Sequence, residues 1–272
     1  MNTASLTAEA SAAAPAAHYE LAVPADARRR LATGWLALAL AALVASGLFS
    51  ILLVLARAPF TKDWFASADF FRVALVVHVD LSVLVWFAAF AGMLWSLNGT
   101  RRALPLAWAG LAAATAGTFA MAAAPFFGSP APIMSNYVPV LDDRLFLSGL
   151  VVFGAGCALT VARAMALAPR VGTRPQGAGA LRFGLNAAAV SAAVALIAFA
   201  WSYLALPAEL EGKAYYEVLF WGGGHVLQFT WTLLMFVAWL ALADAIGARV
   251  PLSPRVAILL FAIGLVSVFA TP

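Results

Sequence analysis

Seven long apolar segments run through this chain, and they restrict it to folds that suit a lipid bilayer. They cover residues 31–56, 69–97, 103–127, 144–168, 183–206, 215–246 and 254–271. A membrane-spanning helix needs about 20 mainly apolar residues. Hydrophobic residues make up 64% of the chain and charged residues only 10%, whereas about a quarter of a soluble domain is charged. We therefore expect an all-α polytopic membrane bundle with about seven transmembrane helices.

The stretch before the first apolar segment is rich in Ala, Ser and Thr and shows no apolar periodicity. Such a composition is typical of a disordered segment. We expect a disordered tail over residues 1–30, with a solvated His18, and a transmembrane domain over residues 31–272. The single cysteine, Cys157, cannot form an internal disulfide, and its apolar neighbours indicate a packing role.

Basic residues are distributed unevenly between the loops on the two sides of the predicted bundle. The side of the N-terminal tail carries eleven: Arg28, Arg29, Arg30, Arg101, Arg102, Arg163, Arg170, Arg174, Arg182, Arg249 and Arg255. The other side carries five: Arg57, Lys62, Arg72, Arg144 and Lys213. Cytoplasmic loops are the ones enriched in Lys and Arg, which predicts a bacterial inner-membrane protein with a cytoplasmic N-terminus. Because the arginines flank apolar segments instead of forming a patch, we expect no nucleic-acid partner.

Two of the three histidines lie inside apolar segments. His78 is about nine residues into the second segment and His225 about ten into the sixth. At 1.5 Å of rise per residue, both would lie about 14–15 Å below the outer helix ends. An ionisable side chain in a bilayer needs a partner or ligand, and imidazole binds iron and copper. The matching depth favours one plane of metal or haem ligands, although each histidine could instead hydrogen-bond a neighbouring helix.

Polar and glycine residues near the two histidines refine this prediction. Asp80 lies about 200° around the helix from His78, so we expect it to make its own interhelical hydrogen bond, or to belong to a proton path. Residues 222–224 are three glycines directly before His225. Glycine permits close approach of a large planar group or of another helix. Gln228 falls at i+3, on the face that a ligand of His225 would share.

These two segments resemble subunit I of the haem–copper oxidase superfamily. In RVALVVHVDLSVLVW an early histidine precedes Trp86 by two turns, and WGGGHVLQF carries a lone histidine on the sixth segment. The superfamily includes terminal oxidases that reduce dioxygen and nitric oxide reductases. The local context is most similar to the branch related to C-type oxidases and nitric oxide reductases, and the resemblance covers the chain from Ala32 onward.

The resemblance implies a cofactor role for each histidine. His78 would be an axial ligand of a low-spin haem, and His225 a ligand of copper, or of non-haem iron in the reductases. The implied parent activity is electron transfer from a cytochrome c-type donor on the outer face to dioxygen, coupled to proton movement. Haem and copper would be the cofactors, and other oxidase subunits would be partners together with the lipid bilayer.

The chain also departs from the superfamily pattern. The superfamily fold has about twelve helices, and the later ones hold most metal ligands, but no histidine follows His225 here. We therefore expect an N-terminal portion of a longer protein, inactive alone. Phe229 stands where many oxidases have a tyrosine and many reductases a glutamate. Two alternatives remain: a self-contained b-type cytochrome with His78 and His225 on one haem, and a structural membrane bundle without a cofactor.

Overall fold

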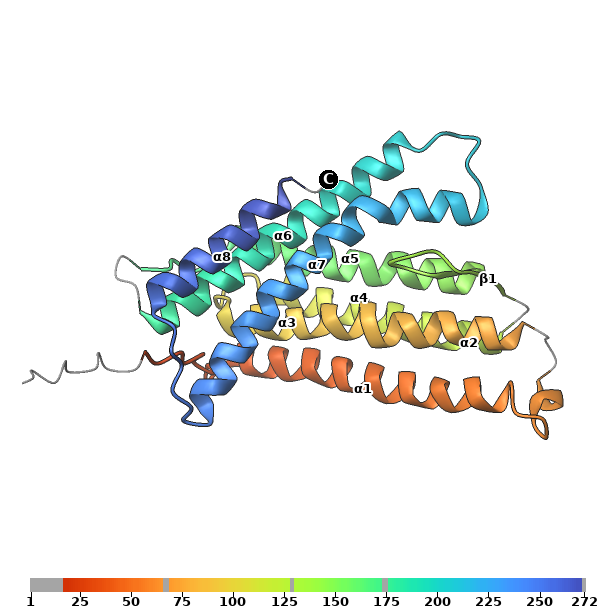
Figure 1. Ribbon diagram of the computed structural model, residues 1–272, viewed down its shortest axis with the longest axis horizontal. Coiled ribbons are helices and arrows are strands. Elements are labelled where there is room, and N and C mark those ends of the chain that lie inside the picture. The colour runs from red at the N-terminus through yellow and green to blue at the C-terminus, as the bar shows by residue number, and fades with distance from the viewer. Residues whose placement is uncertain (1–16, 66–68, 128–129, 173–175, 271–272) are drawn as a thin grey trace, which may run out of the picture.

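The computed structural model describes residues 17–65, 69–127, 130–172 and 176–270, and these residues are mainly helical (Figure 1). Within this part of the chain six helical spans are long and apolar enough to cross a membrane. They are α1 (Ala27–Leu55), the continuous span Phe70–Asn98, α4 (Leu104–Ala123) with its extension to Phe126, α5 (Arg144–Ala166), α6 (Gly177–Ala205) and α7 (Gly212–Ala245). The predicted all-α membrane bundle is confirmed, and the chain is an integral membrane protein.

The seventh expected segment forms a shorter apolar helix, α8 (Pro254–Val268). Its 15 residues extend roughly 22 Å at 1.5 Å per residue, which is less than the hydrocarbon thickness of about 30 Å. Ser253 caps its first turn by accepting a hydrogen bond from the backbone N–H of Val256. This cap and Pro254 at the first helical position fix the start of α8 at the residue where the apolar segment was expected to begin.

The second span is interrupted by a π-helical segment. It consists of α2 (Phe70–Val79), the π-helical η2 (Asp80–Val85) and α3 (Trp86–Asn98). The apolar run predicted one regular helix here. Single π-helical turns inside α-helices are rare and often occur at functional sites, and this one begins two residues after His78.

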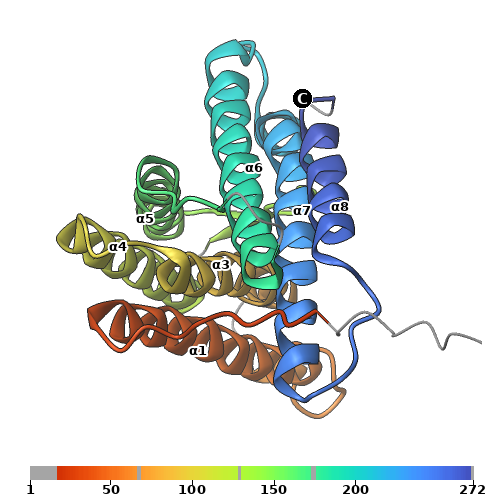
Figure 2. The same ribbon diagram turned by 90° about the vertical axis from the view of Figure 1, so that its left-hand side faces the viewer.

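The helices form two groups that cross at an angle. In Figure 1, α1 to α5 run nearly side by side, whereas α6, α7 and α8 are inclined to them, and Figure 2 shows the same division end-on. The tightest pairs are α4 with α5 and α6 with α7. A Cβ on Gly117 of α4 would lie 2.4 Å from the backbone N of Phe153 in α5, so only glycine permits this approach of the two backbones.

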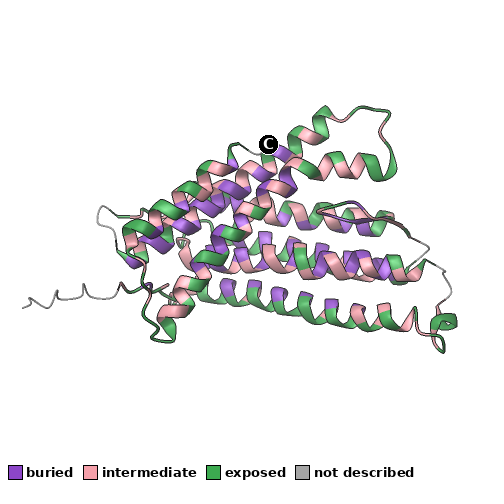
Figure 3. Cartoon of the chain, viewed as in Figure 1, coloured by how far each residue is buried: buried purple, intermediate pink, exposed green. Residues whose placement is uncertain are grey.

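Burial follows the two groups. Buried side chains line the helix faces that meet one another, and the outward faces are exposed (Figure 3). On α1, for example, Trp35 and Leu38 are buried, whereas Leu40, Val44 and Leu48 are exposed. Large apolar side chains exposed along the outside of a bundle suit contact with lipid, as expected of membrane-spanning helices.

The proline-rich segment between α4 and α5, expected as a loop, contains a small β-hairpin. Strands β1 (Ala131–Ile133) and β2 (Val140–Asp142) pair antiparallel, with Pro132 opposite Leu141. Val140 and Leu141 are fully buried, and the hairpin packs against α2 and α5. Apolar burial therefore fixes this segment on the end of the bundle, where it carries Tyr137 in a left-handed conformation with φ 59°.

The chain is ordered earlier than the sequence predicted. Residues 1–16 of the expected tail lie outside the described residues, but Tyr19 is fully buried and its hydroxyl donates to the Leu252 carbonyl at 2.8 Å. Residues 27–30 form the first turn of α1, because Asp26 caps that helix by accepting from the backbone N–H of Arg28. His18, expected to be solvated, has an 86% exposed side chain.

Candidate functional site

His78 is held against α1 through one of its ring nitrogens. Its Nδ1 lies 2.9 Å from the backbone carbonyl oxygen of Ser46, 2.9 Å from the Ser46 hydroxyl and 3.2 Å from the Ser50 hydroxyl. A carbonyl oxygen can only accept a hydrogen bond, so Nδ1 carries the proton. The lone pair of the neutral ring is then on Nε2. A histidine that binds a metal through one nitrogen commonly donates its other N–H to a carbonyl in this way.

The backbone of His78 is fixed as well as its ring. The Ser46 hydroxyl donates to the His78 carbonyl oxygen at 3.0 Å, and the Ser82 hydroxyl donates to the same oxygen at 2.8 Å. Ser46 therefore contacts His78 both at the ring and at the carbonyl, and we call this arrangement the serine clamp. Because Ser46 is buried, water does not compete for these hydrogen bonds, and the ring is pre-oriented.

Asp80 differs from the sequence prediction. Its side chain is only 1% exposed, and within the described part of the chain neither carboxylate oxygen has a hydrogen-bond partner. The expected interhelical hydrogen bond is therefore wrong. Asp80 is the first residue of the π-helical segment, and its angular distance from His78 does not tell which groups its side chain contacts. A buried polar group without a partner lowers stability by about 1–3 kcal/mol.

His225 uses both ring nitrogens within the protein. Nδ1 lies 2.9 Å from the Trp221 carbonyl oxygen, which requires a proton on Nδ1. The hydroxyl oxygen of Tyr137 is 2.8 Å from Nε2 and 2.9 Å from Nδ1. With the proton on Nδ1, Nε2 is the nitrogen to which the Tyr137 hydroxyl can donate. Because its oxygen is almost equidistant from the two nitrogens, the hydroxyl approaches Nε2 over the face of the ring and not along the in-plane lone pair.

Two of the three glycines before His225 make room for aromatic rings. A Cβ on Gly224 would lie 2.4 Å from Cγ of Tyr137, and a Cβ on Gly223 would lie 2.4 Å from the ring of Phe199 in α6. The close approach predicted from these glycines is confirmed, and the planar groups are side chains of the protein itself. Tyr137 was not predicted as a site residue, because it lies 88 positions away in a loop. The glycine run was the only signal that something flat packs here.

The surroundings of Tyr137 keep its hydroxyl protonated. Burial, followed by the negative charge of Glu217, raises the pKa of Tyr137 above its ordinary value of 10.0. Glu217 accepts a hydrogen bond from the backbone N–H of Asn136 at 3.2 Å and lies 3.7 Å from the Lys213 ammonium. These contacts tie the hairpin to the start of α7. Tyr137 therefore remains a hydrogen-bond donor to His225 at neutral pH.

A cleft separates the two helices that carry the histidines. It has a volume of about 490 Å³, within the usual range for ligand sites. Its walls are Val79 and Val83 of the α2–η2 span, Tyr137 of the hairpin, and Trp221, Gln228 and Trp231 of α7. Gln228 is exposed and lines this cleft. The cleft is mainly aromatic and apolar, with few polar groups.

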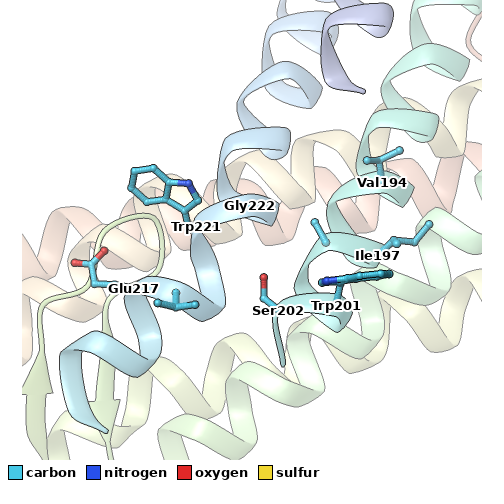
Figure 4. Close-up of a pocket in the computed structure, with 9 residues that line it drawn as sticks. Val194, Ile197, Trp201, Ser202, Glu217, Trp221 and Gly222 are labelled. Carbon is cyan, nitrogen blue, oxygen red and sulfur yellow. The ribbon is translucent and has the colours of Figure 1, made fainter. Parts of the chain in front are cut away.

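A second cavity, of about 680 Å³, lies between α6 and α7. Figure 4 shows Trp201 and Ser202 of α6 on one side and Glu217, Trp221 and Gly222 of α7 on the other. Its polar side chains are Ser202 and Glu217, without a histidine or cysteine in the lining. Through Trp221 it adjoins the His225 site, and Glu217 is the carboxylate in its lining.

The two histidines lie at different positions along their helices. His78 is the ninth residue of a helix that starts at Phe70, whereas α7 starts at Gly212 and His225 is its fourteenth residue. Counting along each helix gives a depth only where both helices begin at the same level, so the equal depth expected from the sequence stays a prediction. Their ring nitrogens contact different elements, α1 for His78 and the hairpin for His225. No group of three His, Cys, Asp or Glu side chains that could hold a metal occurs among the residues described.

Comparison with known proteins gives relatives without an assigned activity. The chain is 28% identical to an uncharacterized protein of Rickettsia prowazekii (strain Madrid E), in a match that covers 80% of this chain and 48% of the relative. It is also 28% identical to an uncharacterized protein of Aquifex aeolicus (strain VF5), over 76% of this chain and 52% of the relative. The chain thus spans about half the length of these curated relatives. No family model and no solved structure matches it.

Proposed function

We propose that this chain is the N-terminal portion of a subunit I of the haem–copper oxidase superfamily, with His78 as one axial ligand of a low-spin haem. The observation that carries the proposal is the hydrogen bond from Nδ1 of His78 to the Ser46 carbonyl oxygen at 2.9 Å. It leaves Nε2 as the nitrogen with a lone pair, the state that an axial histidine requires. Haem bound there would supply one-electron transfer.

The residues around His78 fit this role. The serine clamp of Ser46, together with the hydroxyls of Ser50 and Ser82, holds both the ring and the backbone of His78. A histidine that donates the N–H of its second ring nitrogen to an acceptor is a stronger ligand, and its orientation is fixed. In the proposed protein the clamp positions the ring, and the apolar side chains of the span keep water away from it.

His225 is proposed as a ligand of copper, or of non-haem iron, in the complete protein. The described residues do not fit a metal at this position, because Tyr137 and Trp221 occupy both ring nitrogens. Metal binding at His225 would require the Tyr137 hydroxyl to leave Nε2 and further ligands to come from elsewhere. We therefore derive no step through a metal at His225, and we treat Tyr137 as the residue that satisfies this histidine until such ligands are present.

The parent activity proposed is electron transfer from a cytochrome c-type donor to dioxygen, coupled to proton movement, in a bacterial inner membrane with the N-terminus in the cytoplasm. The chain would act there with other oxidase subunits. Acidic residues on the proposed outer side, among them Glu217 and Asp142, suit the docking of a basic donor protein. Nitric oxide reduction is the alternative within the same superfamily.

The two other functions make different predictions for the histidines. A self-contained b-type cytochrome needs both His78 and His225 on one iron, and the protein contacts of the His225 ring argue against this. A bundle without a cofactor needs neither histidine as an iron ligand. The length of the relatives supports the proposal that this chain is part of a larger protein. Each relative is about twice as long as the stretch that it shares with this chain.

Optical spectra of the protein purified from its native membrane, with any chains that accompany it, test the proposal. We expect a reduced low-spin haem band that disappears in His78→Ala and persists in His225→Ala. Loss of the band in both variants would instead identify the bis-histidine cytochrome. A wild-type protein without haem, in a preparation whose helical circular dichroism is intact, would reject the proposed cofactor role.

A further inference from the structure

A basic pocket lies at the arginine-rich end of the bundle, the end that faces the viewer in Figure 2. Its volume is about 610 Å³. It is enclosed by the segment before α1, the connection between α3 and α4, and the start of α6. Four arginines line it: Arg28, Arg101, Arg102 and Arg182. It lies apart from both histidines, and the proposed function gives it no role.

The charges in this pocket are only partly compensated. Asp26 is shared by two of the arginines, at 2.9 Å from Arg28 Nη2 and 2.9 Å from Arg101 Nε. The hydrogen bonds from these guanidinium groups hold the pKa of Asp26 well below its usual range. Arg182 donates to a neutral group, the Arg170 carbonyl, at 3.0 Å. Glu20 is the carboxylate in the lining itself. Counting Asp26 beside the pocket, four arginines have two acids near them, and the pocket keeps a positive charge.

The loop that presents these arginines is built on a buried guanidinium. Arg163 is 6% exposed, and its Nη2 donates to the carbonyl oxygens of Thr100 at 2.6 Å and Arg102 at 3.2 Å. Arg28 adds a hydrogen bond from Nη1 to the Gly99 carbonyl at 2.6 Å. The backbone of residues 99–102 is therefore fixed from two sides, so the arginines are presented by a formed site and not by a loose loop.

We propose that this pocket binds the phosphate of an anionic phospholipid headgroup. Guanidinium groups match phosphate oxygens in charge and geometry. Basic pockets between transmembrane helices on the cytoplasmic side are a recurring site for such headgroups. The pocket lies where the membrane spans end, and apolar residues such as Leu21, Leu97 and Pro169 share its lining with the arginines. An anionic phospholipid of the bilayer fits both kinds of lining residue, because its phosphate suits the arginines and its acyl chains suit the apolar side chains.

Lipid titrations of the full chain in detergent micelles test this site. The midpoint of thermal unfolding, followed by circular dichroism, is measured against increasing phosphatidylglycerol, and separately against phosphatidylcholine and inorganic phosphate. We expect a saturable rise of the midpoint with phosphatidylglycerol alone. The double variant Arg102→Ala/Arg182→Ala should need roughly 30-fold more of this lipid for half-saturation, from about 1 kcal/mol per arginine.

The matched control is Arg30→Ala/Arg249→Ala, which removes the same charge from exposed positions outside the pocket lining. It should keep the half-saturation of the wild type. If both double variants weaken binding equally, the response reflects net charge and the site is rejected. An equal rise of the midpoint with phosphatidylcholine, or with inorganic phosphate, would overturn the assignment to an anionic lipid. None of these readouts depends on haem.

Discussion

The two membrane-embedded histidines look alike in the sequence and differ in the structure. His78 is fixed through Nδ1 by the serine clamp, and its Nε2 keeps the lone pair. His225 has a partner on each nitrogen, from Tyr137 and from the Trp221 carbonyl. One ring is therefore prepared as a ligand, and the other is satisfied by the protein. The difference arises from the neighbouring residues. At His78, α1 supplies its hydroxyls to Nδ1, whereas at His225 the hairpin supplies a hydroxyl to Nε2.

A substitution in the glycine run beside His225 should have the largest effect on stability. In Gly224→Ala the new Cβ would lie 2.4 Å from Tyr137 Cγ, so the tyrosine must move away from His225. We expect a loss of about 1–3 kcal/mol in the free energy of unfolding, as for other overpacked sites. Chemical denaturation in detergent measures it.

Gly222→Ala is the control for this substitution. Its Cβ would meet only Ala198 at 3.8 Å, an ordinary contact, and alanine favours a helix by up to about 1 kcal/mol over glycine. The control should be neutral or slightly stabilising. Equal destabilisation by both substitutions would show that the tyrosine does not occupy the space at Gly224.

Asp80 offers a second test, on the helix of His78. Since both carboxylate oxygens are buried without a partner among the described residues, an apolar side chain of similar reach removes their desolvation cost. Asp80→Leu should raise the free energy of unfolding by roughly 1–2 kcal/mol. Asp80→Asn, which keeps a polar group, should gain less. A loss of stability in Asp80→Leu would mean that Asp80 has a partner in the membrane.

The hydroxyl groups of the two sites should differ in what they contribute. Tyr137→Phe leaves Nε2 of His225 without its donor and should cost about 0.5–1.5 kcal/mol. Ser46→Ala should cost less, because the Ser46 carbonyl and the Ser50 hydroxyl remain at Nδ1 of His78. The same denaturation measurement compares them. A larger loss of unfolding free energy in Ser46→Ala than in Tyr137→Phe would mean that the ring of His78, and not that of His225, depends on one side-chain hydroxyl.

Alkaline pH should weaken the contact between Tyr137 and His225. The pKa of Tyr137 is raised above 10.0 in the folded protein, so its contribution to stability is complete below about pH 10 and is lost as the pH rises through the folded pKa. Burial raises the pKa of Tyr19 as well, so thermal unfolding between pH 8 and pH 12 should show a decline in both proteins that is less steep in Tyr137→Phe. Identical profiles for the two proteins would mean that Tyr137 is not held as a protonated donor.

Much of the fold followed from the sequence, because long apolar segments and arginine-flanked loops are strong signals. Most membrane helices were expected within a few residues, and the main difference is α6, which starts at Gly177, six residues before the expected segment 183–206. The π-helical segment, the hairpin and the burial of Tyr19 were not expected. They depend on packing between distant parts of the chain, which hydropathy does not encode.

The candidate site was only partly predictable. The sequence identified His78 and His225 because an ionisable side chain in a bilayer is energetically unfavourable without a partner. It predicted neither Ser46 nor Tyr137, since no sequence pattern distinguishes them from other serines and loop tyrosines. Asp80 was expected to have a partner because a polar side chain inside a bilayer needs one, but the described structure gives it none. The comparison between the two rings therefore required the structure.

Rescue of a cavity variant by free imidazole tests the central claim most directly. His78→Gly, purified from the native membrane, should lack the reduced low-spin haem band, and millimolar imidazole should restore it, because the free ring can replace the missing ligand. His225→Gly should keep the band without imidazole. If His78→Gly retains the band, or if imidazole restores nothing while the helical content equals that of the wild type, then His78 is not the axial ligand.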